Sequence, residues 1–194
     1  QGSSEFYFMW IANDVNGWVS KYDTRTGKEV ARYFSVIPKD CANSAGPPCA
    51  GGQVHNLTAA QSWHPSRTAI DLFGDMYVAN RALGLSQGSV TKIANDVSSC
   101  IDRNGNGTIE TSRDINGDGE ISTNPANGEM IVPTDFTNPV QYDECVLFTK
   151  PVGANTNTSV AARALAISAG LEGSAGDVWV GVFFEQRVYK MSTA

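Results

Sequence analysis

The chain has 194 residues, which suits one domain or part of a larger one. Hydrophobic residues make up 41% of it, charged residues only 18%, and 19 residues are Gly, a composition that favours a turn-rich β-protein. The formal net charge is −6 and no basic stripe is present, which argues against a nucleic-acid partner. No apolar run approaches the roughly 20 residues that a membrane-spanning helix needs, so we expect no membrane span.

Short apolar segments bounded by Gly, Asn and Asp predict an all-β fold with ten strands. The alternation of large and polar residues is clearest in Trp18 to Tyr22, as in a half-buried strand. Helix should be nearly absent, apart from a turn in the long insertion that follows the sixth strand. The strands are expected near residues 8–13, 18–23, 29–36, 68–73, 76–80, 89–94, 146–152, 163–168, 178–183 and 187–192.

One strand pattern occurs three times, which indicates an internal repeat. A hydrophobic and aromatic strand is followed by a strand of the form V-x-K-hydrophobic: WIAN with WVSKY, MYVA with SVTKI, and VWVGV with RVYKM. The residues WIAND and VSKYDTRTGKEVARY resemble the blades of bacterial β-propellers of the NHL and YncE-like kind. The resemblance implies a single propeller-like domain or fragment over residues 1–194, with about two and a half four-stranded blades.

The resemblance also implies an assignment of the fourth strands. Thr68 to Phe73 is expected as the outer strand of the first blade, and Ala162 to Ser168 as that of the second. Closed propellers have about four to eight blades, so this chain is either part of a longer one or has edges that must be covered. If the 194 residues are the whole species, we expect self-association through open edges such as Arg187 to Ser192.

The loop from Pro38 to Arg67 contains CANSAGPPC. A disulfide between Cys41 and Cys49 is expected there, with a redox or metal-binding pair as the alternative. His55 and His64 follow without a second ligand at metal spacing, so we interpret both as loop or packing residues. Glycosylation sequons begin at Asn56, Asn106 and Asn157, and they matter only in a host that glycosylates.

Residues 100–145 form a long insertion that contains two tandem loops rich in Asp, Asn and Gly. Asp102, Asn104 and Asn106 stand at positions one, three and five of D-x-N-x-N-G, and the pattern restarts twelve residues later at Asp114. Oxygen ligands on alternate residues around a Gly turn suit Ca²⁺, which takes about six to eight oxygens. The expected ligands are Asp102, Asn104, Asn106, Thr108, Glu110, Asp114, Asn116, Asp118 and Glu120, with Thr108 and Glu120 contributing carbonyls.

These loops resemble EF-hand, dockerin and thrombospondin-type calcium loops, but they depart from the EF-hand at position twelve. Arg113 and Pro125 stand there instead of Glu. Asp114, one residue later, or Glu110 at position nine could supply the missing carboxylate of the first loop. Since no long amphipathic helix flanks either loop, we expect a structural calcium site and no helix-opening sensor.

A second disulfide is expected between Cys100 and Cys145, which bracket the insertion. Four Cys allow three pairings, and the pairs 41–49 and 100–145 are the simplest because each closes a single loop. Disulfides indicate an extracellular, periplasmic or cell-surface protein.

No catalytic constellation is visible, since both His lie in one loop and no nucleophile motif is present, so we predict that the chain is not an enzyme. The favoured function is a secreted, calcium-stabilised propeller module with a structural or protein-interaction role. Two alternatives stay open. One is a carbohydrate-binding propeller that stacks Trp10, Trp18, Trp63 or Trp179 on sugar rings. The other is a segment of a propeller hydrolase or lyase whose active site lies elsewhere.

Overall fold

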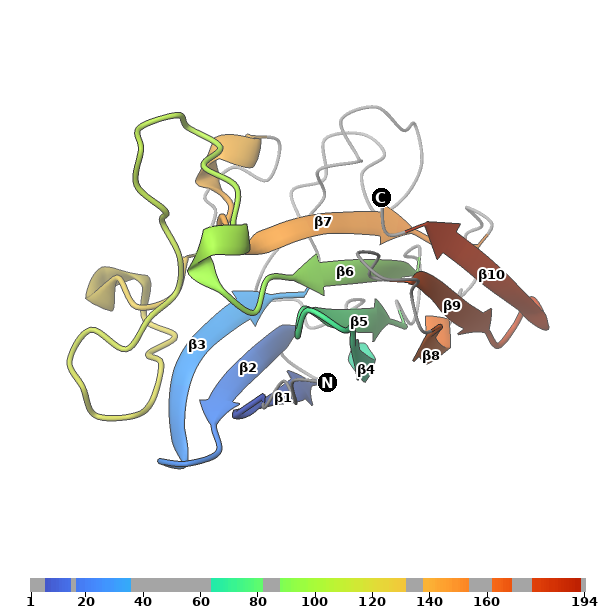
Figure 1. Ribbon diagram of the computed structural model, residues 1–194, viewed down its shortest axis with the longest axis horizontal. Coiled ribbons are helices and arrows are strands. Elements are labelled where there is room, and N and C mark those ends of the chain that lie inside the picture. The colour runs from blue at the N-terminus through green and yellow to red at the C-terminus, as the bar shows by residue number, and fades with distance from the viewer. Residues whose placement is uncertain are drawn as a thin grey trace, which may run out of the picture.

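The structure is a computed structural model that describes residues 6–14, 17–35, 64–81, 88–131, 138–153, 162–168 and 176–192. Over these ranges the chain forms three antiparallel sheets and no α-helix. The sheets follow one another across the molecule in chain order, as Figure 1 shows. The all-β prediction is therefore confirmed, while a closed propeller is not seen.

The first sheet has the strand order β1-β2-β3, with β1 at Phe8–Asn13, β2 at Trp18–Asp23 and β3 at Lys28–Phe34. The turn between β2 and β3 forms because the Asp23 carboxylate accepts the Arg25 amide at 2.9 Å and the Arg25 guanidinium at 2.6 Å. Gly27 closes this turn at φ 72°, a conformation that residues with a Cβ rarely adopt.

The second sheet has four strands in the order β4-β5-β6-β7. Its two central strands are buried at every position, as expected for strands that are covered on both faces. The strand bounds are Pro65–Ile70 for β4, Met76–Asn80 for β5, Ser89–Ile93 for β6 and Val146–Pro151 for β7.

The third sheet has the order β10-β9-β8, with β8 at Ala162–Ile167, β9 at Asp177–Val182 and β10 at Arg187–Ser192. All ten predicted strands are present, with bounds that differ by at most a few residues. The period-two pattern located them because each sheet has one face against a neighbouring sheet.

The predicted assignment of the fourth strands is wrong. β4 pairs with β5 in the second sheet, and β8 pairs with β9 in the third, so each belongs to the sheet whose other strands follow it in sequence. A tight turn sets the β4–β5 pair, because the Asp71 carboxylate accepts the amides of Phe73 at 2.9 Å and Asp75 at 3.0 Å. The observed repeat is therefore four antiparallel strands of which β4 to β7 is the complete copy.

Two apolar clusters join the sheets. The first cluster packs Trp10, Val19 and Tyr33 of the first sheet against Met76 and other residues of the second. The second cluster joins the second sheet to the third, with members Tyr77, Ala79, Val90, Val152, Ala162, Val178, Val180 and Val182. The core of the molecule consequently lies between the faces of successive sheets.

The insertion leaves the second sheet after β6 and returns to it at β7. It holds three short 3-10 helices, η3 at Val97–Ser99, η4 at Pro125–Asn127 and η5 at Pro139–Gln141, which are the only helical turns in the described ranges. On the way it runs beside the outer edge of β3, on the left of Figure 1. No helix among the described residues has the length and apolar character that crossing a membrane requires.

Candidate metal centre

The first loop of the insertion is built around Asp102. One carboxylate oxygen of Asp102 accepts the Gly105 amide at 2.7 Å, and the other accepts the Gly107 amide at 2.8 Å. The side-chain oxygens of Asn104 and Asn106 each accept the amide two residues further on, at 2.9 and 2.7 Å. Short polar side chains thus satisfy the backbone of a loop that has no regular secondary structure.

The second loop repeats these hydrogen bonds with a shift of twelve residues. The Asp114 carboxylate accepts the amides of Gly117 at 2.7 Å and Gly119 at 2.9 Å. Asn116 and Asp118 accept the amides two residues on, both within 2.9 Å. The two loops are therefore copies of one structural unit, as the spacing of Asp102 and Asp114 predicts.

Oxygen-bearing side chains meet inside the first loop. The amide groups of Asn104 and Asn106 donate to the two carboxylate oxygens of Glu110, at 2.8 and 2.9 Å. Asn at positions three and five therefore contact Glu at position nine through their amide nitrogens, while their side-chain oxygens accept backbone amides. In the second loop the corresponding contact joins residues that are closer in the sequence: the side-chain amide of Asn116 donates to the Asp118 carboxylate at 2.9 Å.

Two buried glutamates anchor the loops to other parts of the insertion, and sequence reasoning did not find them. The Glu144 carboxylate accepts the amides of Arg103 at 2.7 Å and Glu110 at 2.9 Å. The Glu129 carboxylate accepts the amide of Ser122 at 2.8 Å, the position equivalent to Glu110 twelve residues on. Both side chains are at most 2% exposed. A visible clue is that each acid lies within an apolar stretch, GEMIV and YDECV.

Asp143 is a third buried acid at the neck of the insertion. Its carboxylate accepts the Ser112 amide at 2.7 Å, the Thr111 hydroxyl at 2.8 Å and the Cys145 amide at 3.0 Å. Burial raises the pKa of Asp143 to about 6, against the opposing effect of these hydrogen bonds and of the Arg103 guanidinium. Arg103 donates to the Asp143 backbone carbonyl at 2.9 Å, and its own pKa is lowered by burial.

Each predicted ligand lies in one of the two loops, but the structure distributes their contacts unevenly. Thr108 and Glu120 donate backbone amides to the preceding Asn or Asp side chain. The Asp114 carboxylate accepts its hydrogen bonds from amides of the second loop, and its sharing with the first loop stays a prediction. No three His, Cys, Asp or Glu side chains converge anywhere in the described ranges, so a cation here would need the Asn side chains and backbone carbonyls.

The expected Cys100–Cys145 disulfide is present and closes the neck of the insertion, across a sequence separation of 45 residues. Its sulfur atoms lie beside the first apolar cluster, to which Cys145 belongs. The predicted Cys41–Cys49 pair lies outside the described residues, as do His55, Trp63 and the sequons at Asn56 and Asn157.

The other candidate residues have varied surroundings. His64 precedes β4 and lies 3.4 Å from the Asp14 carboxylate, and its backbone carbonyl accepts the Arg81 amide at 3.0 Å. Trp10 is buried and Trp18 is half-buried, so neither presents an open ring for sugar stacking. Trp179 is different, because 41% of its surface is exposed on the third sheet.

The fold and the insertion define an all-β protein of repeated antiparallel sheets, in which a disulfide closes an insertion containing two Asp/Asn/Gly loops. No protein-family model, no curated protein and no solved structure matches the chain.

Proposed function

We propose that this chain is a calcium-stabilised β-propeller module of an extracellular or cell-surface protein, with a structural or protein-interaction role. The observation that supports the proposal is the duplicated loop, in which Asp102 and Asp114 make the same pair of hydrogen bonds twelve residues apart. The loop oxygens are the hard ligands that Ca²⁺ selects. Side chains of Asp102, Asn104, Asn106 and Glu110 would hold one ion, and those of Asp114, Asn116 and Asp118 a second.

The structural role follows from where the insertion lies. Its residues Ile121 and Met130 pack against Phe34 of β3, and Tyr142 and Cys145 pack in the cluster between the first two sheets. The loops themselves are polar and bury little surface, so a cation that neutralises their carboxylates would contribute its binding energy to folding this segment. With few formal charges and no Glu at position twelve, affinity should resemble that of extracellular modules, roughly 10⁻⁴ to 10⁻³ M.

Calorimetric titration with Ca²⁺, together with limited proteolysis of residues 100–145 with and without a chelator, tests the proposal. We expect heat of binding at millimolar calcium and faster cleavage of the insertion after chelation. Asp102→Asn and Asp114→Asn should each weaken binding while keeping one side-chain acceptor for the loop amides. Glu120→Gln is the control, because only the backbone carbonyl of this exposed residue is expected to bind. No binding at millimolar calcium, or cleavage that a chelator leaves unchanged, would contradict the proposal.

A further inference from the structure

Each of the three sheets presents the same four positions on one face. In every case an aromatic residue faces a lysine on the next strand, and two residues along a small residue faces a valine. We call these four positions the leading quartet. Its members are Trp10, Lys21, Ala12 and Val19 in the first sheet, Tyr77, Lys92, Ala79 and Val90 in the second, and Trp179, Lys190, Gly181 and Val188 in the third.

The geometry of the leading quartet is conserved between the sheets. The lysine nitrogen lies over the aromatic ring at 5.2 Å in the first sheet, 5.2 Å in the second and 5.6 Å in the third. In the first two sheets the quartet is packed against the next sheet. Val19 and Val90 are each 0% exposed, and they belong to the clusters that join successive sheets.

The opposite face of each sheet carries aliphatic residues that receive the leading quartet of the sheet before. Met76 and Val78 of β5 pack in the cluster with the first quartet, and Val178 and Val180 of β9 pack in the cluster with the second. The equivalent residues of the first sheet are Met9 and Ile11, on the outer face of β1. They are 48% and 38% exposed, whereas Met76 and Val78 are fully buried.

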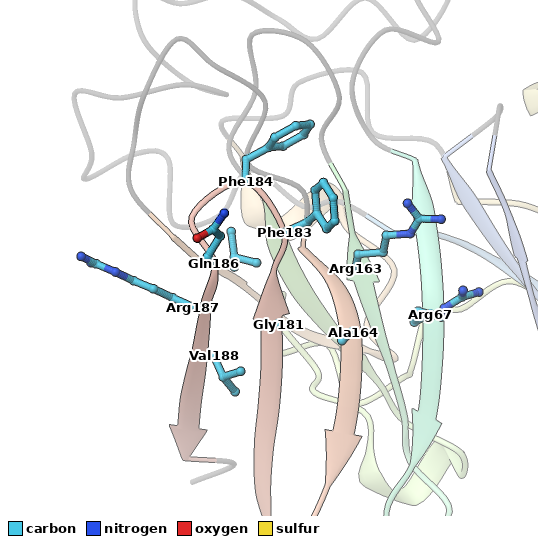
Figure 2. A pocket seen from close by; sticks show the side chains of 10 residues that line it. Arg67, Arg163, Ala164, Gly181, Phe183, Phe184, Gln186, Arg187 and Val188 are labelled. Atoms are coloured by element: carbon cyan, nitrogen blue, oxygen red, sulfur yellow. The ribbon is translucent and has the colours of Figure 1, made fainter.

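The third leading quartet is likewise uncovered. Trp179 is 41% exposed and Val188 is 67% exposed. Val188 and Gly181 line a groove of about 640 Å³. Figure 2 shows this groove, whose lining also includes Ala164, Phe183 and the side chains of Arg67, Arg163 and Arg187. Space is left in this groove because the small residues Gly181 and Ala164 pair across β9 and β8. This groove lies on the face of the third sheet that is equivalent to the face of the second sheet against which Val180 and Val182 pack.

The charges of the third quartet are already matched for burial. The Lys190 nitrogen lies 2.8 Å from the Asp177 carboxylate, as the buried Lys92 nitrogen lies 3.0 Å from Asp75 at the equivalent position. Covering the Lys190 and Asp177 side chains would therefore bury an ion pair of the kind that the second sheet already buries.

We propose that the leading quartet of the third sheet binds the Met9 and Ile11 face of a second copy of this chain. The two surfaces differ, so the contact is head-to-tail. We expect its packing to resemble the apolar contacts that already join the first sheet to the second and the second to the third. This goes beyond the proposed calcium-stabilised module, because neither surface includes a residue of the insertion. It also differs from association by strand edges, since it buries side chains on the faces of two sheets.

Sedimentation velocity up to about 100 µM tests for the contact. We expect the 194-residue chain to form assemblies larger than a monomer, and we expect Val188→Lys to weaken association at least about tenfold. Val140→Lys is the matched control, because Val140 is 47% exposed on the insertion and lies outside both surfaces. Circular dichroism of each variant checks that the sheets remain folded.

Complementation distinguishes this contact from edge pairing. Ile11→Lys should also give a monomer, yet a mixture of Val188→Lys and Ile11→Lys chains should form a dimer, because each retains the surface that the other has lost. A monomeric parent chain would overturn the proposal. In that case a further sheet of a longer polypeptide would be the alternative partner for the leading quartet of the third sheet. Association that survives both substitutions, or a mixture that stays monomeric, would overturn it as well. Calcium binding by the insertion is unaffected by any of these results, so the two proposals fail separately.

Discussion

Lys21, Lys92 and Lys190 occupy equivalent positions in the three sheets, but their electrostatic surroundings differ. Lys92 pairs with the Asp75 carboxylate and Lys190 with that of Asp177, and each Asp lies two residues before the aromatic residue of its quartet. The residue at that position in the first sheet is Phe8, whose ring centroid lies 3.9 Å from the Lys21 nitrogen. Burial therefore lowers the pKa of Lys21 to about 8, although Asp96 and Asp75 act to raise it.

Phe8→Asp should raise the pKa of Lys21 toward its ordinary value, because a carboxylate near the nitrogen favours the charged form. In the parent chain the folded state binds this proton less tightly than the unfolded state. The free energy of unfolding should therefore rise as pH increases from about 8 to about 10.5, and the variant should lose this rise. Carbon-13 titration of the Lys21 side chain measures the shift. A titration midpoint that Phe8→Asp leaves at about 8 would contradict it.

Asp143 should make stability depend on pH with the opposite sign. Its folded pKa of about 6 lies above the ordinary value of 3.8, so the folded state retains a proton that the unfolded state releases. The free energy of unfolding should consequently fall, by roughly 3 kcal/mol, as pH rises from about 4 to about 6. Urea titrations of the parent chain and of Asp143→Asn measure this. The variant should lack the fall but be less stable throughout, because its amide opposes one of the three donors. An equal slope in both chains would show that another group titrates.

At the scale of elements, the insertion protects an edge strand. In the described ranges no strand pairs with the outer edge of β3. Instead its Glu29 amide donates to the Gly119 carbonyl at 2.8 Å, and its Arg32 amide donates to the Ser112 hydroxyl at 2.9 Å. In return the buried Glu29 carboxylate accepts the Ile121 amide at 3.0 Å. Thr68 to Phe73 was expected as the outer strand of this unit, but β4 pairs with β5 and the insertion runs along the outer edge of β3 instead. Covering an edge strand with a loop is a known protection against unwanted pairing.

Gly119 and Gly117 provide a matched test of the contact between the insertion and β3. Both have positive φ, at 89° and 78°, so an alanine at either position costs about 1–2 kcal/mol of backbone strain. A Cβ at Gly119 would also lie 2.9 Å from the Lys28 side chain, whereas one at Gly117 would meet nothing within 4 Å. Gly119→Ala should therefore destabilise the chain more than Gly117→Ala does, by thermal unfolding. Equal effects would show that the strain alone matters and that β3 tolerates displacement of the loop.

The local sequence pattern predicted where the strands and loops lie better than it predicted which elements contact one another. The strands and the two loops were predictable because period-two alternation and Asp-x-Asn spacing are properties of adjacent residues. The sheet to which β4 belongs was not predictable in this way. It depends on a tight turn at Asp71 that joins β4 to β5, and the sequence pattern did not distinguish this turn from a connection between two different sheets. The anchoring of the loops by Glu29 and Glu144 was also hidden, because these contacts join residues far apart in the chain.

At the scale of the whole molecule, the insertion packs with residues of the first two sheets, whereas among the described residues the third sheet shares an apolar cluster only with the second. Tyr142, Cys145 and Ile121 of the insertion or its neck contribute to clusters that include first-sheet residues. The third sheet adds residues only to the cluster it shares with the second. Local unfolding should follow this division, because stability within a structure varies with the contacts of each unit.

Hydrogen exchange should therefore be slowest in β5 and β6, which are buried at every position, and fastest in β10, where most residues are exposed.

Replacing both Cys100 and Cys145 by Ala should lower the free energy of unfolding by about 2–5 kcal/mol, since the unfolded chain gains freedom. Under conditions in which this variant stays folded, backbone amides of β3 and of the insertion should exchange faster than in the parent chain. The reason is that the disulfide at the neck helps to hold the insertion against the edge of β3. Exchange in β9 should change least, since no insertion residue packs on the third sheet within the described ranges. Uniform acceleration across all three sheets would show instead that the molecule opens only as a whole.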